Sequence, residues 1–147
     1  MKKFKFSLDK LKSYREQILK TEENELGRRR KKVIALHEER AMLELEVEQL
    51  NEEFRRRAMN SMTPQEIKVS KGYIATLQEN IRELGGKILK AQDRVEQQIQ
   101  VVVEATKEVS SLEKLEEGQL EEYNKVAMKH EEQFIEEFVS NSSFYAH

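Results

Sequence analysis

The side chains that could do chemistry in this 147-residue chain are its histidines, its paired glutamates and its basic runs. The histidines are His37, His130 and His147, and none belongs to the HExxH spacing that places two zinc-binding imidazoles on one helix face. We therefore expect solvent or helix-packing positions for them, and no metal site. The chain has no cysteine, which excludes disulfides, thiolate metal sites and cysteine nucleophiles.

Adjacent glutamates occur at 116–117, 121–122 and 136–137. Two carboxylates work as acid and base in a concave, water-excluding pocket that shifts their pKa values, and a long helix offers no such pocket. The glycines do not form the GxxxxGK[ST] loop that cradles nucleotide phosphates. We therefore predict no catalytic residue, no cofactor and no small-molecule substrate, and we predict that the protein is not an enzyme.

Two basic runs, RRRKK at 28–32 and RRR at 55–57, could contact nucleic acid. Consecutive residues on a helix point in all directions, so the first run does not form a one-sided stripe. Glutamates also surround it, at positions 22, 23, 25, 38 and 39. The sequence therefore favours a solvated surface and no nucleic-acid partner. The alternative function is a basic coiled coil that binds nucleic acid or an acidic membrane through these runs and the N-terminal lysines.

Composition indicates long, solvated helices. Charged residues make up 37% of the chain, and there are only one proline and five glycines to interrupt a helix. The net charge of −2 argues against a disordered chain, because such chains usually carry a high net charge. The longest apolar run is Val101 to Val103, too short for a signal peptide or a membrane span, so we expect a soluble protein.

The segment MTPQEI at 62–67 predicts the start of a helix. Thr63 suits the N-cap position, Pro64 the first helical position, and Glu66 the position from which a capping box closes. Met62 and Ile67 stand at the two positions of a hydrophobic staple. We therefore predict that one helix ends just before this segment and a second begins at Pro64.

Apolar residues recur every three or four positions on both sides of that segment. The first series runs from Leu8 to Phe54 and the second from Ile67 to Leu112, with a few polar residues among them. Beyond Gly118 the series shifts, which predicts a stutter, to Leu120, Tyr123, Ala127, His130, Phe134 and Phe138.

These patterns predict an all-α protein, a single long antiparallel coiled-coil hairpin of two helices over residues 1–147. Helix 1 would cover about 7–60, the turn about 61–63, helix 2 about 64–139, and a flexible tail 140–147. Folding at this turn places residue i opposite residue 122 − i, roughly, so the second helix would overhang the first. The sequence leaves open the oligomeric state, because the seams could close within one chain or pair with a second hairpin.

Charges also bear on the register. Arg29 would face Asp93 and Glu96, and Arg40 would face Glu79 and Glu83. Residues 1–20 hold seven basic and two acidic side chains, and residues 104–139 hold four basic and 11 acidic, so the two segments should attract each other. Gly85 and Gly86 mark either a weak, bendable point of helix 2 or a close approach of helix 1.

Three stretches resemble the FliJ family, the small coiled-coil component of the bacterial flagellar type III export apparatus. They are FKFSLDKLKSYREQ at 4–17, GYIATLQENI at 72–81 and LEKLEEGQLEEYNKVAMKHEEQFIEEF at 112–138. The chain departs from the family at 134–137, where Phe-Ile-Glu-Glu stands and many members carry Leu-Asp-Glu. The equivalent component of a virulence type III secretion system is the alternative within the same class.

The resemblance implies a cytoplasmic, non-enzymatic protein, peripherally associated with the inner-membrane export apparatus. It would be the central stalk and coupling factor of the hexameric export ATPase, contact the cytoplasmic domain of the export gate, and serve as an export chaperone or escort for substrate chaperones. The resemblance implies ATPase-ring contacts at Phe4, Phe6, Leu8, Leu11, Leu120, Tyr123, Phe134 and Phe138. It implies gate contacts at Tyr73, Leu77, Asn80 and Leu84, although Leu77 and Leu84 are also seam positions.

Overall fold

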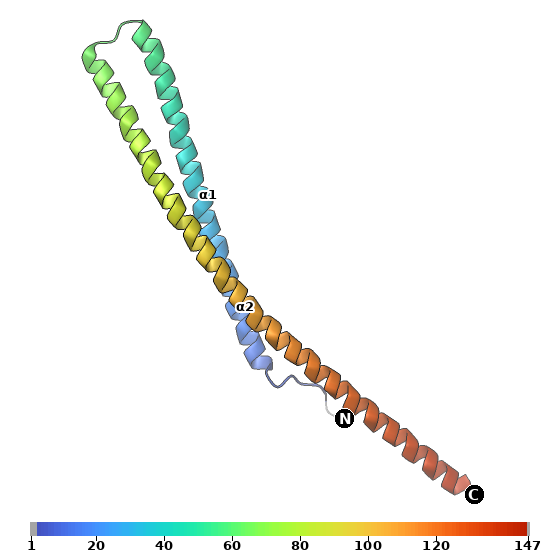
Figure 1. Cartoon of the computed structure of the whole chain (residues 1–147). Coiled ribbons are helices and arrows are strands. Elements are labelled where there is room, and N and C mark those ends of the chain that lie inside the picture. Colours follow the sequence, from blue (N-terminus) through green and yellow to red (C-terminus); the bar gives the residue numbers. More distant parts are fainter. Residues whose placement is uncertain (1–2, 147) are drawn as a thin grey trace. The chain divides into compact units, whose positions relative to one another are not determined.

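The computed structural model describes residues 3–146, with side chains for residues 3–142. Helix α1 is Asp9–Met59 and helix α2 is Pro64–Ala146, and the two pack against each other as an antiparallel hairpin (Figure 1). The predicted all-α hairpin with a longer second helix is confirmed. Helix α2 continues through 140–146, where the sequence predicted a flexible tail, because no proline or glycine follows Gly118 to stop it. Residue 147 lies outside the described residues.

The turn between the helices is held by the predicted cap. The backbone N–H of Glu66 donates to Thr63 Oγ1 at 3.2 Å, and the N–H of Ile67 donates to the Thr63 carbonyl at 3.1 Å. The Glu66 carboxylate does not close a capping box in the described part of the chain; it lies 3.5 Å from the guanidinium of Arg57, across the turn. Ser61 takes a left-handed backbone conformation, with φ at 68°, and lets the chain reverse.

The chain divides into two compact units, each with a piece of both helices. We call Glu22–Val102 the turn unit, and Met1–Thr21 with Val103–His147 the terminal unit. Each is described here by itself.

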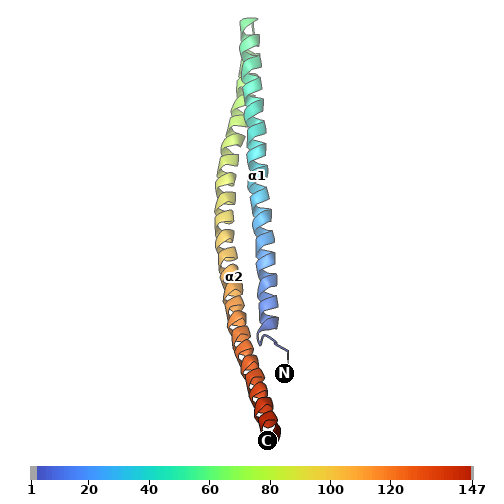
Figure 2. The same ribbon diagram turned by 90° about the vertical axis from the view of Figure 1, so that its right-hand side faces the viewer.

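In the turn unit the two helices run side by side (Figure 2). Apolar side chains from both form a seam between them. Val47, Ile74 and Leu77 form its centre, with Leu43, Leu50 and Ile81 packed around them. Every seam position that the sequence predicted in this unit is buried or half-buried, from Glu22 to Phe54 on α1 and from Ile67 to Val102 on α2. The seam is therefore the core of this unit.

Gln98 occupies a seam position that the apolar pattern skipped, and at 3% exposure it is as buried as any seam residue. Its side-chain amide donates to Glu22 Oε2 at 2.6 Å and to the Glu22 backbone carbonyl at 3.0 Å. These two hydrogen bonds join α1 to α2 within the seam. A buried amide satisfied in this way tolerates only the register that brings the two residues together.

The seam arginines do not pair as predicted. Arg29 donates to Glu25 of its own helix at 2.9 Å and to the Arg94 backbone carbonyl at 2.9 Å, and not to Asp93 or Glu96. Arg40 lies 3.7 Å from Glu44 and 3.3 Å from His37, both on α1. A carboxylate one helical turn away is closer than one on the facing helix, so the local pair forms instead.

The terminal unit is closed by a different set of contacts. Phe6, Val109 and Leu112 are buried there, and Lys12 Nζ lies 2.6 Å from Glu116 Oε2, as the opposite charges of the two segments predicted. The Ser7 and Gln119 side chains exchange hydrogen bonds. These polar contacts continue the seam of α2 from Leu112 to positions 116, 119 and 123 in its regular period.

The shift predicted directly after Gly118 therefore lies farther along α2, between Tyr123 and Ala127, where two four-residue steps follow each other and Val126 is exposed. Gln119 holds the half-buried position and Leu120 is 40% exposed, because hydrogen bonding to Ser7 places a glutamine where hydrophobicity alone favoured the leucine. Tyr123 and Ala127 are half-buried as predicted. Beyond them His130, Phe134 and Phe138 are exposed, so α1 and the N-terminal segment no longer cover α2.

Gly85 and Gly86 lie within an uninterrupted stretch of α2, and a Cβ atom on either would meet nothing within 4 Å outside the local helix backbone. The close approach of helix 1 at this point is therefore not observed. We expect Gly86→Ala to raise the free energy of unfolding by about 1 kcal/mol, because alanine loses less backbone entropy in a helix. Urea unfolding followed by circular dichroism measures this. A lower stability than the parent would mean that the glycine serves a conformation other than this helix.

Gln98→Leu tests the polar contact in the seam. We expect it to raise the free energy of unfolding by about 1 kcal/mol, because a leucine gains apolar burial while the Glu22 carboxylate can turn to water. Gln98→Ala, which removes the same hydrogen bonds without filling the space, should lower it. The same urea unfolding compares them, and equal losses in both variants would contradict a seam that prefers an apolar side chain here.

Candidate functional site

The described part of the chain offers surfaces rather than an enclosed site. Among the residues described, no helix is long and apolar enough to cross a membrane, and no three potential metal ligands gather. Of the histidines, His37 is half-buried beside Arg40 and His130 is exposed, while His147 lies outside the described residues. The predicted contact residues must therefore be judged by which faces they occupy.

The N-terminal segment before α1 packs onto α2 in the terminal unit. The ring of Phe4 lies 5.6 Å from that of Tyr123, tilted by 56°, and Phe6 is buried. Phe4 and Phe6 were predicted to contact an ATPase ring; Phe6 packs inside the terminal unit, Phe4 is half-buried, and the ring contact stays a prediction for both. An open groove of about 560 Å³ borders this contact, lined by Lys3, Phe4, Lys5, Gln119, Glu122, Tyr123 and Val126.

The other predicted ring contacts are accessible. Leu8, Leu11 and Leu120 are each about two-fifths exposed, whereas Phe134 and Phe138 are 70% and 65% exposed. Ile135 and Val139 are also more than half exposed, so the apolar side chains of 134–139 share one broad face of α2. Four glutamates, at 131, 132, 136 and 137, accompany them. This acidic and aromatic end of α2, residues 128–142, is the overhang.

The four predicted gate contacts fall into two classes. Tyr73 and Asn80 are exposed, but Leu77 and Leu84 are 6% and 5% exposed and lie in the seam against α1. Those two leucines therefore pack in the seam of the closed hairpin, and the gate contact stays a prediction for all four residues. The Tyr73 hydroxyl donates to Glu46 Oε1 at 2.9 Å, and this bond raises the pKa of the tyrosine.

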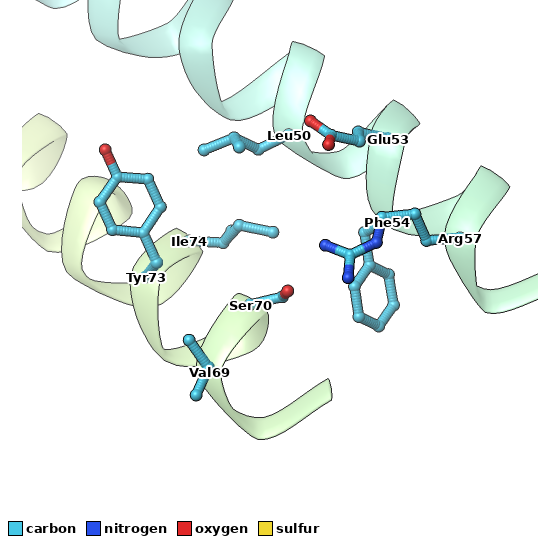
Figure 3. A pocket seen from close by; sticks show the side chains of 8 residues that line it. All are labelled: Leu50, Glu53, Phe54, Arg57, Val69, Ser70, Tyr73 and Ile74. Carbon is cyan, nitrogen blue, oxygen red and sulfur yellow. The ribbon is translucent and has the colours of Figure 1, made fainter. Parts of the chain in front are cut away.

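A cavity of about 190 Å³ lies beside Tyr73, near the turn (Figure 3). Phe54 lines this cavity. The apolar pattern of the sequence predicted Phe54 only as a seam residue, so it did not predict a cavity there. Figure 3 shows α1 and α2 each contributing one side of the cavity, from Leu50, Glu53, Phe54 and Arg57 and from Val69, Ser70, Tyr73 and Ile74.

The basic run 28–32 is split between two surfaces. Arg28, Arg29 and Lys32 line one cavity together with Arg94 of α2, whereas Arg30 lines another with Ile34. The prediction that the run alone makes no one-sided stripe is confirmed. The contribution of Arg94 was missed, because it depends on the register of the second helix.

Comparison with known proteins identifies the family. The family model described as "Flagellar FliJ protein" matches residues 4–145, nearly the whole chain. No curated protein and no solved structure matches it. The family is a non-catalytic component of the flagellar export apparatus. On this match, the chain belongs to the flagellar FliJ family.

Proposed function

We propose that this protein is the central stalk and coupling factor of the hexameric flagellar export ATPase, held in the ring by the overhang. The observation that carries the proposal is the exposed aromatic face of the overhang, with Phe134 and Phe138 uncovered beyond the end of the hairpin's seam. An apolar patch of this kind, set among charged residues, is typical of a protein–protein contact.

A stalk of one helix inside a ring of six subunits cannot match each subunit with a fixed set of hydrogen bonds. Apolar and long-range charge contacts tolerate the mismatch, because they depend little on direction. The overhang has this character, with aromatic side chains among glutamates. By touching several subunits at once it would raise their effective concentration and favour the assembled ring.

Phe4 and Phe6 would act by positioning. The Phe4 ring on Tyr123 and the Ser7–Gln119 hydrogen bonds would hold the N-terminal segment against α2 shortly before the overhang. Exposed Leu8, Leu11 and Leu120 are then the apolar rim of the terminal unit available to the ring.

We further propose that the turn unit contacts the cytoplasmic domain of the export gate through Tyr73 and Asn80, with exposed Val69 on the same side of α2. Leu77 and Leu84 would support this face from within the seam. The role as export chaperone or escort for substrate chaperones, and a place beside the inner membrane, follow from family membership and belong to the same proposal.

The overhang is tested with Phe134→Ala/Phe138→Ala. We expect this variant to bind the purified cognate export ATPase about tenfold more weakly and to stimulate its hydrolysis less, because exposed aromatic anchors dominate such interfaces. A coupled ATPase assay and sedimentation of the ring measure the two effects. The control is Leu45→Ala/Leu89→Ala, which removes exposed apolar side chains from the turn unit. Undiminished stimulation by the first variant would contradict the stalk assignment.

The gate surface is tested with Tyr73→Ala/Asn80→Ala. We expect a loss of about tenfold in affinity for the soluble gate domain, measured by calorimetry, with ATPase stimulation kept, because the two contacts lie in different units. Gln78→Ala/Glu79→Ala, at exposed positions on other faces of α2, is the matched control. If both pairs weaken gate binding equally, Tyr73 and Asn80 have no special part in it.

A further inference from the structure

Cations from both helices gather on one side of the turn unit. A cavity of about 140 Å³ is lined by Arg28, Arg29 and Lys32 of α1 and by Ala91 and Arg94 of α2. The lining residues therefore carry three guanidinium groups, one ammonium group and a methyl group. The proposed contacts with the ATPase ring and the gate use none of these residues.

Only one carboxylate takes part in this cluster. Glu25 accepts hydrogen bonds from Arg28 at 2.6 and 2.8 Å and from Arg29 at 2.9 Å, and these bonds lower its pKa to about 2. Of the other acids close in sequence, Glu22 accepts from Gln98, Asp93 accepts from Gln97, and Glu96 lines a different cavity; none of the acids near the run lines this one. One negative charge thus faces four positive ones.

Lys32 and Arg94 form no ion pair within the part of the chain that the structure describes. Lys32 lines the cavity together with Ala91 of α2, and no carboxylate is among the lining residues. The four cations that line it repel one another, and this repulsion costs stability. A ligand that neutralises the excess charge would remove this cost.

We propose that this basic pocket binds a compact phosphate-rich anion, a diphosphate or triphosphate group. A guanidinium group can pair with two phosphate oxygens at once, and three arginines line this cavity, of which Arg28 and Arg29 share the single carboxylate of Glu25 and Arg94 has no acidic partner among the described residues. A single carboxylate brings one charge, too little for the excess that Glu25 leaves. Nucleic acid spreads single charges along its backbone, whereas a small cavity with four cations favours charges held close together.

The chemistry is shared by inorganic oligophosphate and by a nucleoside triphosphate. Lys87 and Lys90 lie on the same side of α2 as Arg94, seven and four residues before it, and would extend the field to a longer anion. Since Arg28 is 71% exposed, an anion could enter from solvent without opening the seam.

The experiment is calorimetric titration of the full chain with inorganic tripolyphosphate and, in parallel, with ATP. We expect saturable binding at one site, and a loss of about tenfold or more in Lys32→Gln/Arg94→Gln, because each lost cation removes charge-assisted hydrogen bonds. Equal affinity for the two ligands supports oligophosphate recognition, and tighter ATP binding supports recognition of a nucleotide; both sustain the proposal. Circular dichroism checks that the variant, altered only at the surface of the pocket, keeps its helix content.

The control is Arg30→Gln/Lys71→Gln, which removes the same charge. Arg30 belongs to the same basic run but lines a different cavity with Ile34 and Gln92, and Lys71 is an exposed residue of α2. We expect this control to change tripolyphosphate affinity less than about twofold, since only the general field is altered.

Several results would overturn the proposal. An equal loss of tripolyphosphate affinity in the two variants would show that the anion is attracted by the net charge of the protein and does not bind in this pocket. Absence of tripolyphosphate and ATP binding at low salt would remove the ligand class. Polyglutamate binding as tightly as tripolyphosphate would assign the surface to an acidic protein segment. Phosphatidylglycerol vesicles captured through Lys32 and Arg94, without tripolyphosphate binding, would assign it to a membrane surface.

Discussion

The contact between α1 and α2 is the constraint on which the other features depend, because neither helix can bury its apolar stripe alone. The core that results is only one side chain wide. No large side chain of the described residues falls below 2% exposure, and the apolar seam residues that count as buried keep 3–9%. In so thin a core each seam position matters, and almost every residue of either helix remains open to solvent and to partners.

A thin seam also leaves little to distinguish one register from the next, since a slip of seven residues matches apolar residues to apolar residues again. Polar groups supply the difference. Gln98 with Glu22 and Lys12 with Glu116 pair side chains that a slip would separate, so each pair is satisfied only in the observed alignment. These bonds contribute less stability than leucines at the same positions would. By fixing the register, they decide which surface residues of α1 and α2 become neighbours.

Local signals in the sequence were sufficient for the elements and the seam. The cap at Thr63 and the three- and four-residue spacing of apolar residues depend on neighbours within one helical turn. They can therefore be predicted from the sequence without knowing the position of the other helix. The polar seam residues were not, because Gln98 is buried through a hydrogen bond to Glu22 of α1, and Gln119 is half-buried through hydrogen bonds to Ser7, which precedes α1. Arg29 lies at the predicted seam position, but its acidic partner is Glu25 of the same helix and not a carboxylate of α2. A rule that pairs residues across helices does not consider this nearer glutamate.

The same limit explains why surfaces were harder to predict than the fold. Tyr73 and Leu77 are four residues apart, yet one is exposed and the other is buried against α1. Arg28 and Arg30 are two apart and line different cavities. In a two-helix hairpin a surface consists of positions flanking the seam on both helices, so the meaning of a residue depends on what the second helix places beside it. The basic run at 28–32 thus forms part of a pocket with four cationic residues only because the register of the hairpin places Arg94 of α2 beside it.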